Sequence, residues 1–441
     1  MIMNRLIEIA EAFTEGEKKY KEIMESKEYV RFCANEYYGS GNICGNTANR
    51  TVDGDNLQYM KFLIGEKKLG GMMQLIYVDP PFFSNGKYRA SVKIKSDILG
   101  ESQLIKVGAY NDYWGENLKE YLTMLTVRFF MMRELMSETG CLWVHLDWHA
   151  VHYVKVILDA IFGEKNFINE IIWTYKSGGT NKRSFSKKHD TLLIYGKSST
   201  YKFNRLTEKS YNREFKPYRF KGVEEFEDEK GWYTKVNMKD VWNIDMVGRT
   251  SSERTGYATQ KPEKLMERII SSCSDEGDLC ADFFAGSGTF GDVCGALNRR
   301  WIMCDSGYTA ISSQINRLAD GCTNFAVERT GKQFEQTNGS ISLDVGENPC
   351  GHSSIKLLKY LPDMKDICCS DDAVVLKYLK EDSLSLIKFW SIDTDFDGKL
   401  HRAGRVYSGE QRTVHFEKKL QRGKNSFVGY DIFGNRVSKV F

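Results

Sequence analysis

Two short apolar segments of this 441-residue chain end abruptly in loops whose residues are suited to chemistry. The first, residues 75–78, is rich in strand-forming residues and runs directly into Asp79-Pro80-Pro81-Phe82. The second, residues 279–284, is followed by Ala285-Gly-Ser-Gly-Thr289. Open α/β sheets bind their ligands beyond the carboxyl ends of buried strands. The two segments therefore predict an α/β fold in which both loops belong to one site.

The residues of the first loop are suited to holding an amino group. Each proline has a fixed φ and no N–H, so the carbonyls of Asp79 and Pro80 are rigidly placed and free to accept hydrogen bonds. Asp79 and the Pro80 carbonyl can therefore bind both hydrogens of an exocyclic amine, while Phe82 stacks on the ring that carries it. Taken alone, the same residues are also typical of a turn after a buried strand.

The second loop is suited to a ligand that approaches the backbone closely. Glycines at a strand-to-helix turn permit that approach, and the amino end of the helix expected over residues 290–298 favours a carboxylate. Residues 300–305 predict a further strand that ends in Asp305. This carboxylate follows Asp282 at nearly the spacing at which dinucleotide-binding folds hold ribose hydroxyls.

Both loops, in this order, resemble those of β-class DNA amino-methyltransferases, in particular the modification (Mod) subunits of type III restriction-modification systems. Several other segments resemble the family in the same order, over about residues 50–320. They are Gly54-Asp55-Asn56-Leu57, Trp143-Val-His-Leu-Asp147, residues 149–162 and 166–173, Asp240-Val-Trp242, Ser252-Glu-Arg254, Gly256-Tyr257 and Thr259-Gln-Lys-Pro-Glu263. Two positions depart from the family pattern: Phe283 replaces a usual proline, and Phe82 replaces a usual tyrosine but keeps the stacking face.

The resemblance implies a Rossmann-like methyltransferase sheet with helices on both faces, and S-adenosylmethionine as the methyl donor. Its catalytic residues would be Asp79, Pro80, Pro81 and Phe82. Its cofactor-binding residues would be Asp55, Asn56, Asp79, Thr259, Gln260, Lys261, Pro262, Asp282, Phe284, Gly286, Ser287, Gly288, Thr289 and Asp305. The resemblance assigns the ribose hydroxyls to Asp305 and places Asp55 near the adenine ring of the donor.

The acceptor implied by the resemblance is a base flipped out of duplex DNA, in a restriction-modification setting. Aspartate before the two prolines favours adenine N6, with cytosine N4 as the alternative. A methyltransferase-like subunit that binds nucleic acid and needs a partner for activity is a further alternative. The residues of both loops favour an enzyme.

A basic stretch between the two loops favours contact with DNA. Residues 173–221 contain thirteen Lys or Arg residues against three acids, with ten aromatic residues interleaved. Such a stretch is often only a solvated face, but here it lies where the family carries its target-recognition region. Its candidate DNA-binding residues are Lys182, Arg183, Lys187, Lys188, Arg213, Lys216 and Arg219. Residues 177–188 are expected to form a mobile loop.

The pattern along the chain predicts five parts. They are an N-terminal helical segment (1–50, with helices over 5–38), a first catalytic half (51–172), a target-recognition region (173–250), a second catalytic half (251–335) and a C-terminal module (336–441) that is β-rich at its end. The β-rich end is expected from residue 385 onward, where short strand-like runs alternate with turns. Its role is left open between a second DNA contact and a structural one.

Cysteine spacing, histidine spacing and hydropathy exclude several other classes. The eleven cysteines are scattered without a Cys-x-x-Cys pair, and the histidines show no metal-ligand spacing, so neither zinc nor disulfides are expected. For His145, at a predicted strand end, a structural role is favoured over a catalytic one. No long apolar run and no signal-peptide pattern occur, which predicts a cytoplasmic protein. Double-stranded DNA is the expected partner, and a homodimer and a restriction subunit are left open.

Overall fold

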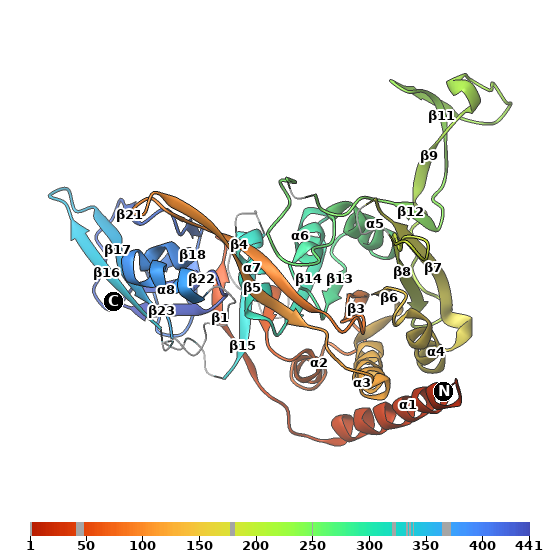
Figure 1. Cartoon of the computed structure of the whole chain (residues 1–441), viewed down its shortest axis with the longest axis horizontal. Helices are drawn as coiled ribbons and strands as arrows, with labels where there is room; N and C mark the ends of the chain where they lie inside the picture. Colours follow the sequence, from red (N-terminus) through yellow and green to blue (C-terminus); the bar gives the residue numbers. More distant parts are fainter. Residues whose placement is uncertain are drawn as a thin grey trace.

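The computed structural model describes residues 2–40, 48–176, 181–248, 250–319, 323–331, 334, 337, 339–363 and 372–441. A large sheet with helices occupies the middle of an elongated molecule, and the C-terminal module lies at one end (Figure 1). The loop expected over residues 177–188 lies partly outside the described residues.

Within the described residues, the main sheet has 11 strands in the order β12-β7-β8-β6-β3-β13-β14-β2-β15-β1-β19. Their bounds are β1 (Phe32–Tyr38), β2 (Asn49–Asp53), β3 (Met73–Val78), β6 (Met136–Leu146), β7 (Phe167–Thr174), β8 (His189–Gly196), β12 (Val241–Asn243), β13 (Leu279–Asp282), β14 (Arg300–Asp305), β15 (Phe325–Thr330) and β19 (His401–Ala403). The strands from β6 to β15 in this order run parallel, whereas β8 and β1 are antiparallel to their neighbours β6 and β15.

Strands β3 and β13, which carry the two loops, are neighbours at the centre of this sheet. Leu75 lies opposite Cys280, and Tyr77 lies opposite Asp282. Because the two strands run in the same direction, the loops that follow them emerge at the same edge of the sheet. The two loops therefore lie side by side.

Helices cover both faces of the sheet because each has an apolar stripe to bury. One face is covered by α1 (Ile2–Glu25), α2 (Asn56–Gly65), α3 (Leu118–Leu135) and α4 (Val151–Phe162). The other is covered by α5 (Glu263–Cys273), α6 (Thr289–Ala296) and α7 (Tyr308–Ala319). In α5, for example, Leu265, Ile269 and Cys273 follow one another at every fourth position and are fully buried. The predicted α/β class, with helices on both faces, is confirmed.

Two β excursions leave the main sheet. The hairpin of β4 (Lys87–Ser96) and β5 (Glu101–Asn111) begins just after the Asp79 loop. The second excursion, here called the arm, comprises β9 (Thr207–Tyr211), β10 (Glu225–Asp228) and β11 (Gly231–Asn237). Figure 1 shows the arm standing away from the body, at the end opposite the C-terminal module.

The C-terminal module is antiparallel, as its turn-rich sequence predicts, but its strands begin well before residue 385. One sheet contains β16 (Ser340–Glu347), β17 (Ser353–Leu361) and β21 (Thr413–Phe416); the other contains β18 (Ile387–Asp393), β20 (Tyr407–Ser408), β22 (Ser426–Asp431) and β23 (Arg436–Val440), and α8 (Asp372–Glu381) packs beside them. Ile94 and Ile105 of the β4–β5 hairpin share the buried core of this module with Tyr360 and Trp390. The hairpin therefore connects the module to the main sheet.

The N-terminal region differs from the helices expected over residues 5–38. Helix α1 ends at Glu25, and residues 32–38 form β1, which pairs with β15 on one side and β19 on the other. Tertiary pairing decides this segment, because its apolar side chains are buried against distant strands. Among the described residues, no helix is long and apolar enough to cross a membrane.

Candidate active site

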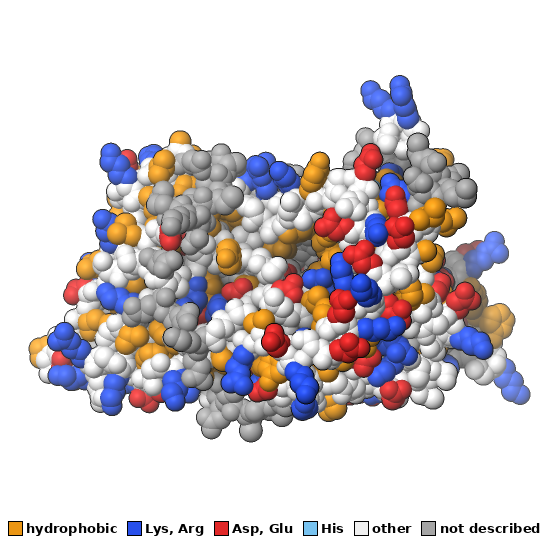
Figure 2. Space-filling model, turned by 90° about the horizontal axis from the view of Figure 1, so that it is seen from below, with side chains coloured by type: hydrophobic (Ala, Val, Ile, Leu, Met, Phe, Trp, Pro, Cys, Tyr) orange, Lys and Arg blue, Asp and Glu red, His pale blue; other side chains and the backbone are white. Residues whose placement is uncertain are grey.

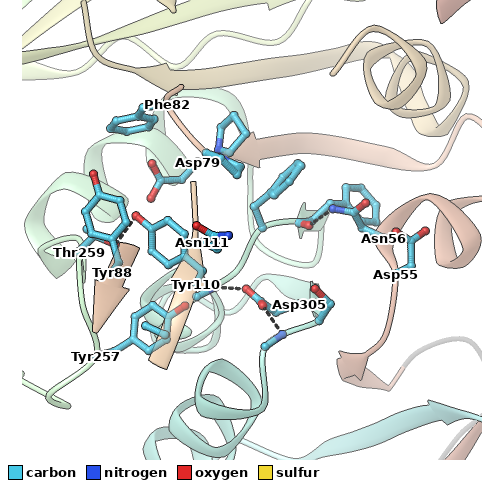
Figure 3. Close-up of a pocket in the computed structure, with 18 of the residues that line it drawn as sticks. Asp55, Asn56, Asp79, Phe82, Tyr88, Tyr110, Asn111, Tyr257, Thr259 and Asp305 are labelled. Atoms are coloured by element: carbon cyan, nitrogen blue, oxygen red, sulfur yellow. Dashed lines mark hydrogen bonds between the residues drawn. The ribbon is translucent and has the colours of Figure 1, made fainter. Parts of the chain in front are cut away.

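A cavity of about 380 Å³ opens at the edge of the sheet where β3, β13 and β14 end. Figure 3 shows Asp79 and Phe82 toward one end of it, Asp55 and Asn56 toward the other, and Asp305 between them. Most of the predicted catalytic and cofactor-binding residues line it. They are Asp55, Asn56, Asp79, Pro80, Pro81, Phe82, Thr259, Lys261, Phe284, Gly286 and Asp305.

Asp79 supplies a carboxylate at the Phe82 end of the cavity, and its two oxygens have different surroundings. Oδ2 accepts a hydrogen bond from the ammonium of Lys261, which also lies 5.5 Å from the centre of the Phe82 ring. Oδ1 is buried and has no hydrogen-bond partner among the described residues. A buried acceptor without a partner costs free energy. The Asp79 carboxylate therefore has unused capacity to accept hydrogen bonds.

Asp112, just beyond the hairpin, holds the loop that contains Phe82. Its carboxylate accepts hydrogen bonds from the backbone N–H groups of Phe82 (3.1 Å), Phe83 (3.1 Å) and Ser84 (2.8 Å). The Tyr121 hydroxyl donates to the Pro81 carbonyl at 2.7 Å, whereas no described residue donates to the Pro80 carbonyl. The loop is thus rigid, and the Pro80 carbonyl is left available.

The glycine loop and Asp305 form the middle of the cavity. The backbone N–H of Gly286 donates to Asp305 Oδ2 and that of Gly307 to Oδ1, both at 2.8 Å. Burial raises the pKa of Asp305, against the effect of these hydrogen bonds. Gly286 has φ +48°, and a Cβ there would lie 3.2 Å from the Tyr257 ring. A side chain here would be strained and would crowd Tyr257, so glycine keeps this part of the backbone accessible from the cavity.

At the far end, polar side chains join α2 to the loop after β13. Asp55 accepts from the Gln58 N–H at 2.9 Å and thereby caps α2, and its other oxygen lies 3.2 Å from the Arg128 guanidinium. Asn56 donates to the Phe283 carbonyl and accepts from Arg128 Nε, both at 2.7 Å. This end can offer a partly exposed carboxylate to a polar ligand.

The remaining predicted cofactor residues lie beside or behind the cavity. Asp282, Ser287 and Thr289 line a small adjoining pocket of about 30 Å³, and burial raises the pKa of Asp282 well above its usual range. Gln260 points away and holds its own loop, accepting from the Thr255 N–H and donating to the Glu253 carbonyl. Pro262 precedes α5, and Gly288 packs on Gln314, so neither lines the cavity.

Several lining residues were not identified from the sequence. Tyr88, Tyr110 and Asn111 come from the hairpin, and Tyr257 lies across from the glycine loop. The Tyr88 and Tyr110 rings stack at 4.6 Å, and the Tyr110 hydroxyl lies 3.4 Å from Thr259 Oγ1. Alternating residues on either side of the turn at Gly100 could have indicated the hairpin, but nothing in the sequence indicates that it reaches the cavity.

A buried polar network lies behind Asp79. The Tyr77 hydroxyl lies 2.8 Å from His145 Nδ1, and His145 Nε2 lies 3.1 Å from Asp190 Oδ2. Asp190 also accepts a hydrogen bond from the Tyr175 hydroxyl at 3.0 Å. His145 is fully buried, and its Nδ1 lies 3.9 Å from Asp79 Oδ1. His145 therefore places this network next to the unpartnered oxygen of Asp79.

The candidate DNA-binding residues fall into two groups. Lys182, Arg183, Lys187 and Lys188 lie in the segment before β8, where the Lys187 ammonium is 3.3 Å from the centre of the Trp148 ring. Arg213, Lys216 and Arg219 are exposed on the arm. By contrast, Lys/Arg and Asp/Glu are interspersed on the face seen in Figure 2, the side on which α1 lies, where Lys19 and Lys21 pair with Glu15 and Glu17.

Comparison with known proteins identifies the family of this chain. The DNA methylase family model matches residues 73–316, more than half of the chain. The type II methyltransferase M.EcaI of Enterobacter cloacae is 26% identical over 57% of this chain and 66% of its own length. The DNA adenine methyltransferase YhdJ of Escherichia coli (strain K12) is 24% identical over 68% of this chain and 92% of its own.

The Mod subunit of the type III restriction-modification enzyme EcoP15I of Escherichia coli is 24% identical over 35% of this chain and 25% of its own length. The similarity to type III subunits is thus present, and the matches to M.EcaI and YhdJ extend over more of the chain. The family match spans both loops and the segments between them. The chain belongs to the DNA methylase family.

Proposed function

We propose that the protein transfers a methyl group from S-adenosylmethionine to N6 of an adenine flipped out of duplex DNA. The observation that carries the proposal is that the Asp79 carboxylate and the Pro80 carbonyl, unpartnered among the described residues, line the cavity together with the Phe82 ring. Two acceptors beside an aromatic face suit the two N–H groups of an amine on a ring. The similarity to YhdJ, which is named a DNA adenine methyltransferase, favours adenine over cytosine.

In this proposal the chain orients the reacting groups. Asp79 and the Pro80 carbonyl accept both amine hydrogens, which favours a tetrahedral nitrogen whose lone pair points toward the donor. When bound, S-adenosylmethionine supplies a cationic methyl donor, so no strong base is needed to activate the amine. Phe82 stacks on the base. We assign the donor to the remainder of the cavity, with Gly286, Asp305 and Asp55 along its length.

The first test is Asp79→Ala. We expect DNA methylation to fall below detection, because the amine loses its main acceptor, while calorimetric binding of S-adenosylmethionine stays close to wild type. Asp97→Ala, at the exposed tip of the hairpin, is the matched control and should leave activity unchanged. Mass spectrometry of digested DNA identifies the product as N6-methyladenine or N4-methylcytosine. Turnover near the wild-type rate in Asp79→Ala would overturn the proposed role.

We propose a restriction subunit as a partner, because one relative is named the Mod subunit of a type III restriction-modification enzyme. A homodimer is a second assembly that we propose to test. Light scattering of the purified protein reports its oligomeric state. Co-purification from the native host reports a restriction subunit.

A further inference from the structure

The buried pair of His145 and Asp190 has no part in holding the amine or the donor, yet it lies directly behind Asp79. His145 is fully buried, and Asp190 is only 8% exposed. A buried carboxylate needs compensation to remain charged. Burial raises the pKa of Asp190, but the hydrogen bond from His145, the charge of Lys261 and the hydrogen bond from Tyr175 outweigh burial and leave the pKa lowered. Asp190 is therefore a carboxylate that accepts the Nε2–H of His145.

The hydrogen bond to Tyr77 identifies the other nitrogen of His145 as an acceptor. Burial and the neighbouring carboxylates of Asp79, Asp282 and Asp190 raise the pKa of Tyr77 well above its usual range, so its hydroxyl stays protonated. With Nε2–H donated to Asp190, Nδ1 carries a lone pair and accepts from Tyr77. The same nitrogen lies 3.9 Å from the buried Oδ1 of Asp79.

We propose that His145, oriented by Asp190, is a positioning residue that accepts, through Asp79, the proton that the target amine loses on methylation. This inference rests on the proposed function. As the nitrogen–carbon bond forms, the bond from the methyl carbon to sulfur breaks and its electron pair stays on sulfur. The nitrogen then carries one proton too many, and Asp79 Oδ2 accepts it.

The proton then moves from Asp79 to His145. The neutral carboxyl group of Asp79 turns its O–H toward Nδ1, and the Tyr77 hydroxyl rotates away from that nitrogen. His145 takes the proton, and Asp79 becomes a carboxylate again, ready for another amine. The resulting imidazolium lies between the carboxylates of Asp79 and Asp190, which stabilises it. After the product leaves, the imidazolium returns the proton to solvent through Asp79, which lines the cavity.

The other groups around His145 either stabilise or oppose a positive charge on its imidazole. Trp173 from β7 contacts the imidazole edge to face at 5.4 Å, and the Phe82 ring lies at 5.8 Å; both are uncharged. Lys261, paired with Asp79, is the cation that opposes an imidazolium. Tyr175 donates to Asp190 and leaves its charge in place. Two carboxylates therefore face the imidazole against one cation.

The test is His145→Gln, followed by single-turnover methyl transfer from about pH 5.5 to about pH 9. We expect the pH dependence of the rate to differ between wild type and His145→Gln, because only the wild type keeps a proton acceptor behind Asp79. At neutral pH the variant should be slower by about 10-fold or more. Binding of S-adenosylmethionine should be unchanged, because His145 does not line the cavity.

A second variant and a control complete the design. Asp190→Asn keeps the shape of the side chain but removes the charge that stabilises the imidazolium, so we expect a smaller rate loss and a pH profile that differs from that of wild type. His149→Gln, next to the same strand end, removes a partly exposed imidazole and should keep the wild-type profile.

An active wild-type protein whose pH profile survives both His145→Gln and Asp190→Asn would overturn this inference and leave the proposed function standing. A wild-type protein that transfers no methyl group would overturn both.

Discussion

Asp79 and Lys261 come from segments 182 positions apart and form an ion pair at the end of the cavity. Their side chains are only 18% and 10% exposed, so neither charge is fully solvated. In this position Lys261 holds one oxygen of the carboxylate and still leaves room for an amine, because each carboxylate oxygen accepts more than one hydrogen bond. The sequence indicated both residues but not that they touch.

Removing the cation should destabilise the fold. In Lys261→Met the carboxylate of Asp79 loses its ion-pair partner in a largely buried place, and we expect the free energy of unfolding to fall by about 2 kcal/mol. Urea denaturation measures the change. Lys264→Met, on the exposed side of α5, is the matched control and should change stability little. An unchanged free energy of unfolding in Lys261→Met would show that the pair contributes nothing to stability.

Among the secondary-structure elements, those that carry the site were predictable. The strand-like segments before both loops became β3 and β13, and residues 300–305 became β14, because short apolar runs bounded by turn residues indicate buried strands. The β4–β5 hairpin was not predicted. Its strands mix charged and apolar residues, and its buried positions are covered by the C-terminal module, which local patterning does not reveal.

The arm lets the proposed DNA binding be tested as one element. We expect the triple variant Arg213→Ala/Lys216→Ala/Arg219→Ala to bind duplex DNA more weakly at low salt. The slope of log K against log salt should decrease by about one unit for each DNA phosphate that the arm no longer neutralises. Lys216 should contribute least, because it is paired with Glu214.

Fluorescence titration of labelled duplex at several salt concentrations measures this slope. A matched triple substitution of Lys18, Lys19 and Lys21 on α1, away from the arm, should leave the slope unchanged (Figure 1). Equal slopes for wild type and the arm variant would assign DNA binding to the segment around Lys182 and Arg183 instead.

For the whole molecule, a buried charge cluster joins the C-terminal module to the main sheet. Glu36 of β1 is fully buried and lies 2.7 Å from both Arg329 and Arg436, and it accepts a hydrogen bond from Tyr430. Burial raises the pKa of Glu36, but the two guanidinium groups outweigh it and lower the pKa to about 2. The buried charge of Glu36 is thus fully compensated only when the C-terminal module packs against the main sheet, and this compensation stabilises the contact between them.

His401 in the same junction makes stability depend on pH. It is buried between the hydroxyls of Ser391 and Ser426, and burial lowers its pKa to about 3. Below about pH 6.5 His401 is protonated in the unfolded chain but stays neutral in the folded chain. The free energy of unfolding therefore decreases as the pH falls from about 6.5 to about 3. Burial raises the pKa of Asp431 to about 6, so this carboxyl group increases the free energy of unfolding as the pH falls below about 6.

Replacing His401 tests its contribution to the pH dependence of the free energy of unfolding. When the pH falls from 7 to 5, the free energy of unfolding of His401→Gln should decrease by about 2 kcal/mol less than that of wild type. Urea denaturation at the two pH values measures this, and exposed His415→Gln is the control. Parallel pH dependences for wild type and His401→Gln would contradict the assignment.

The sequence by itself determined the buried strands that carry the two loops, the order of those loops, and the residue types at the site. These are local properties, since an apolar run, a proline pair or a glycine turn limits the backbone wherever it occurs. Only the tertiary structure decided that β3 and β13 are neighbours, that Lys261 meets Asp79, and that the hairpin lines the cavity.

His145 illustrates the physical reason. Its sequence context favoured a structural role, because one histidine at a strand end has no chemistry without partners. Tyr77, Asp190 and Asp79 reach it from β3, β8 and the loop after β3. The free energy of a buried charge depends on all the groups around it, and those groups are brought together only by the fold.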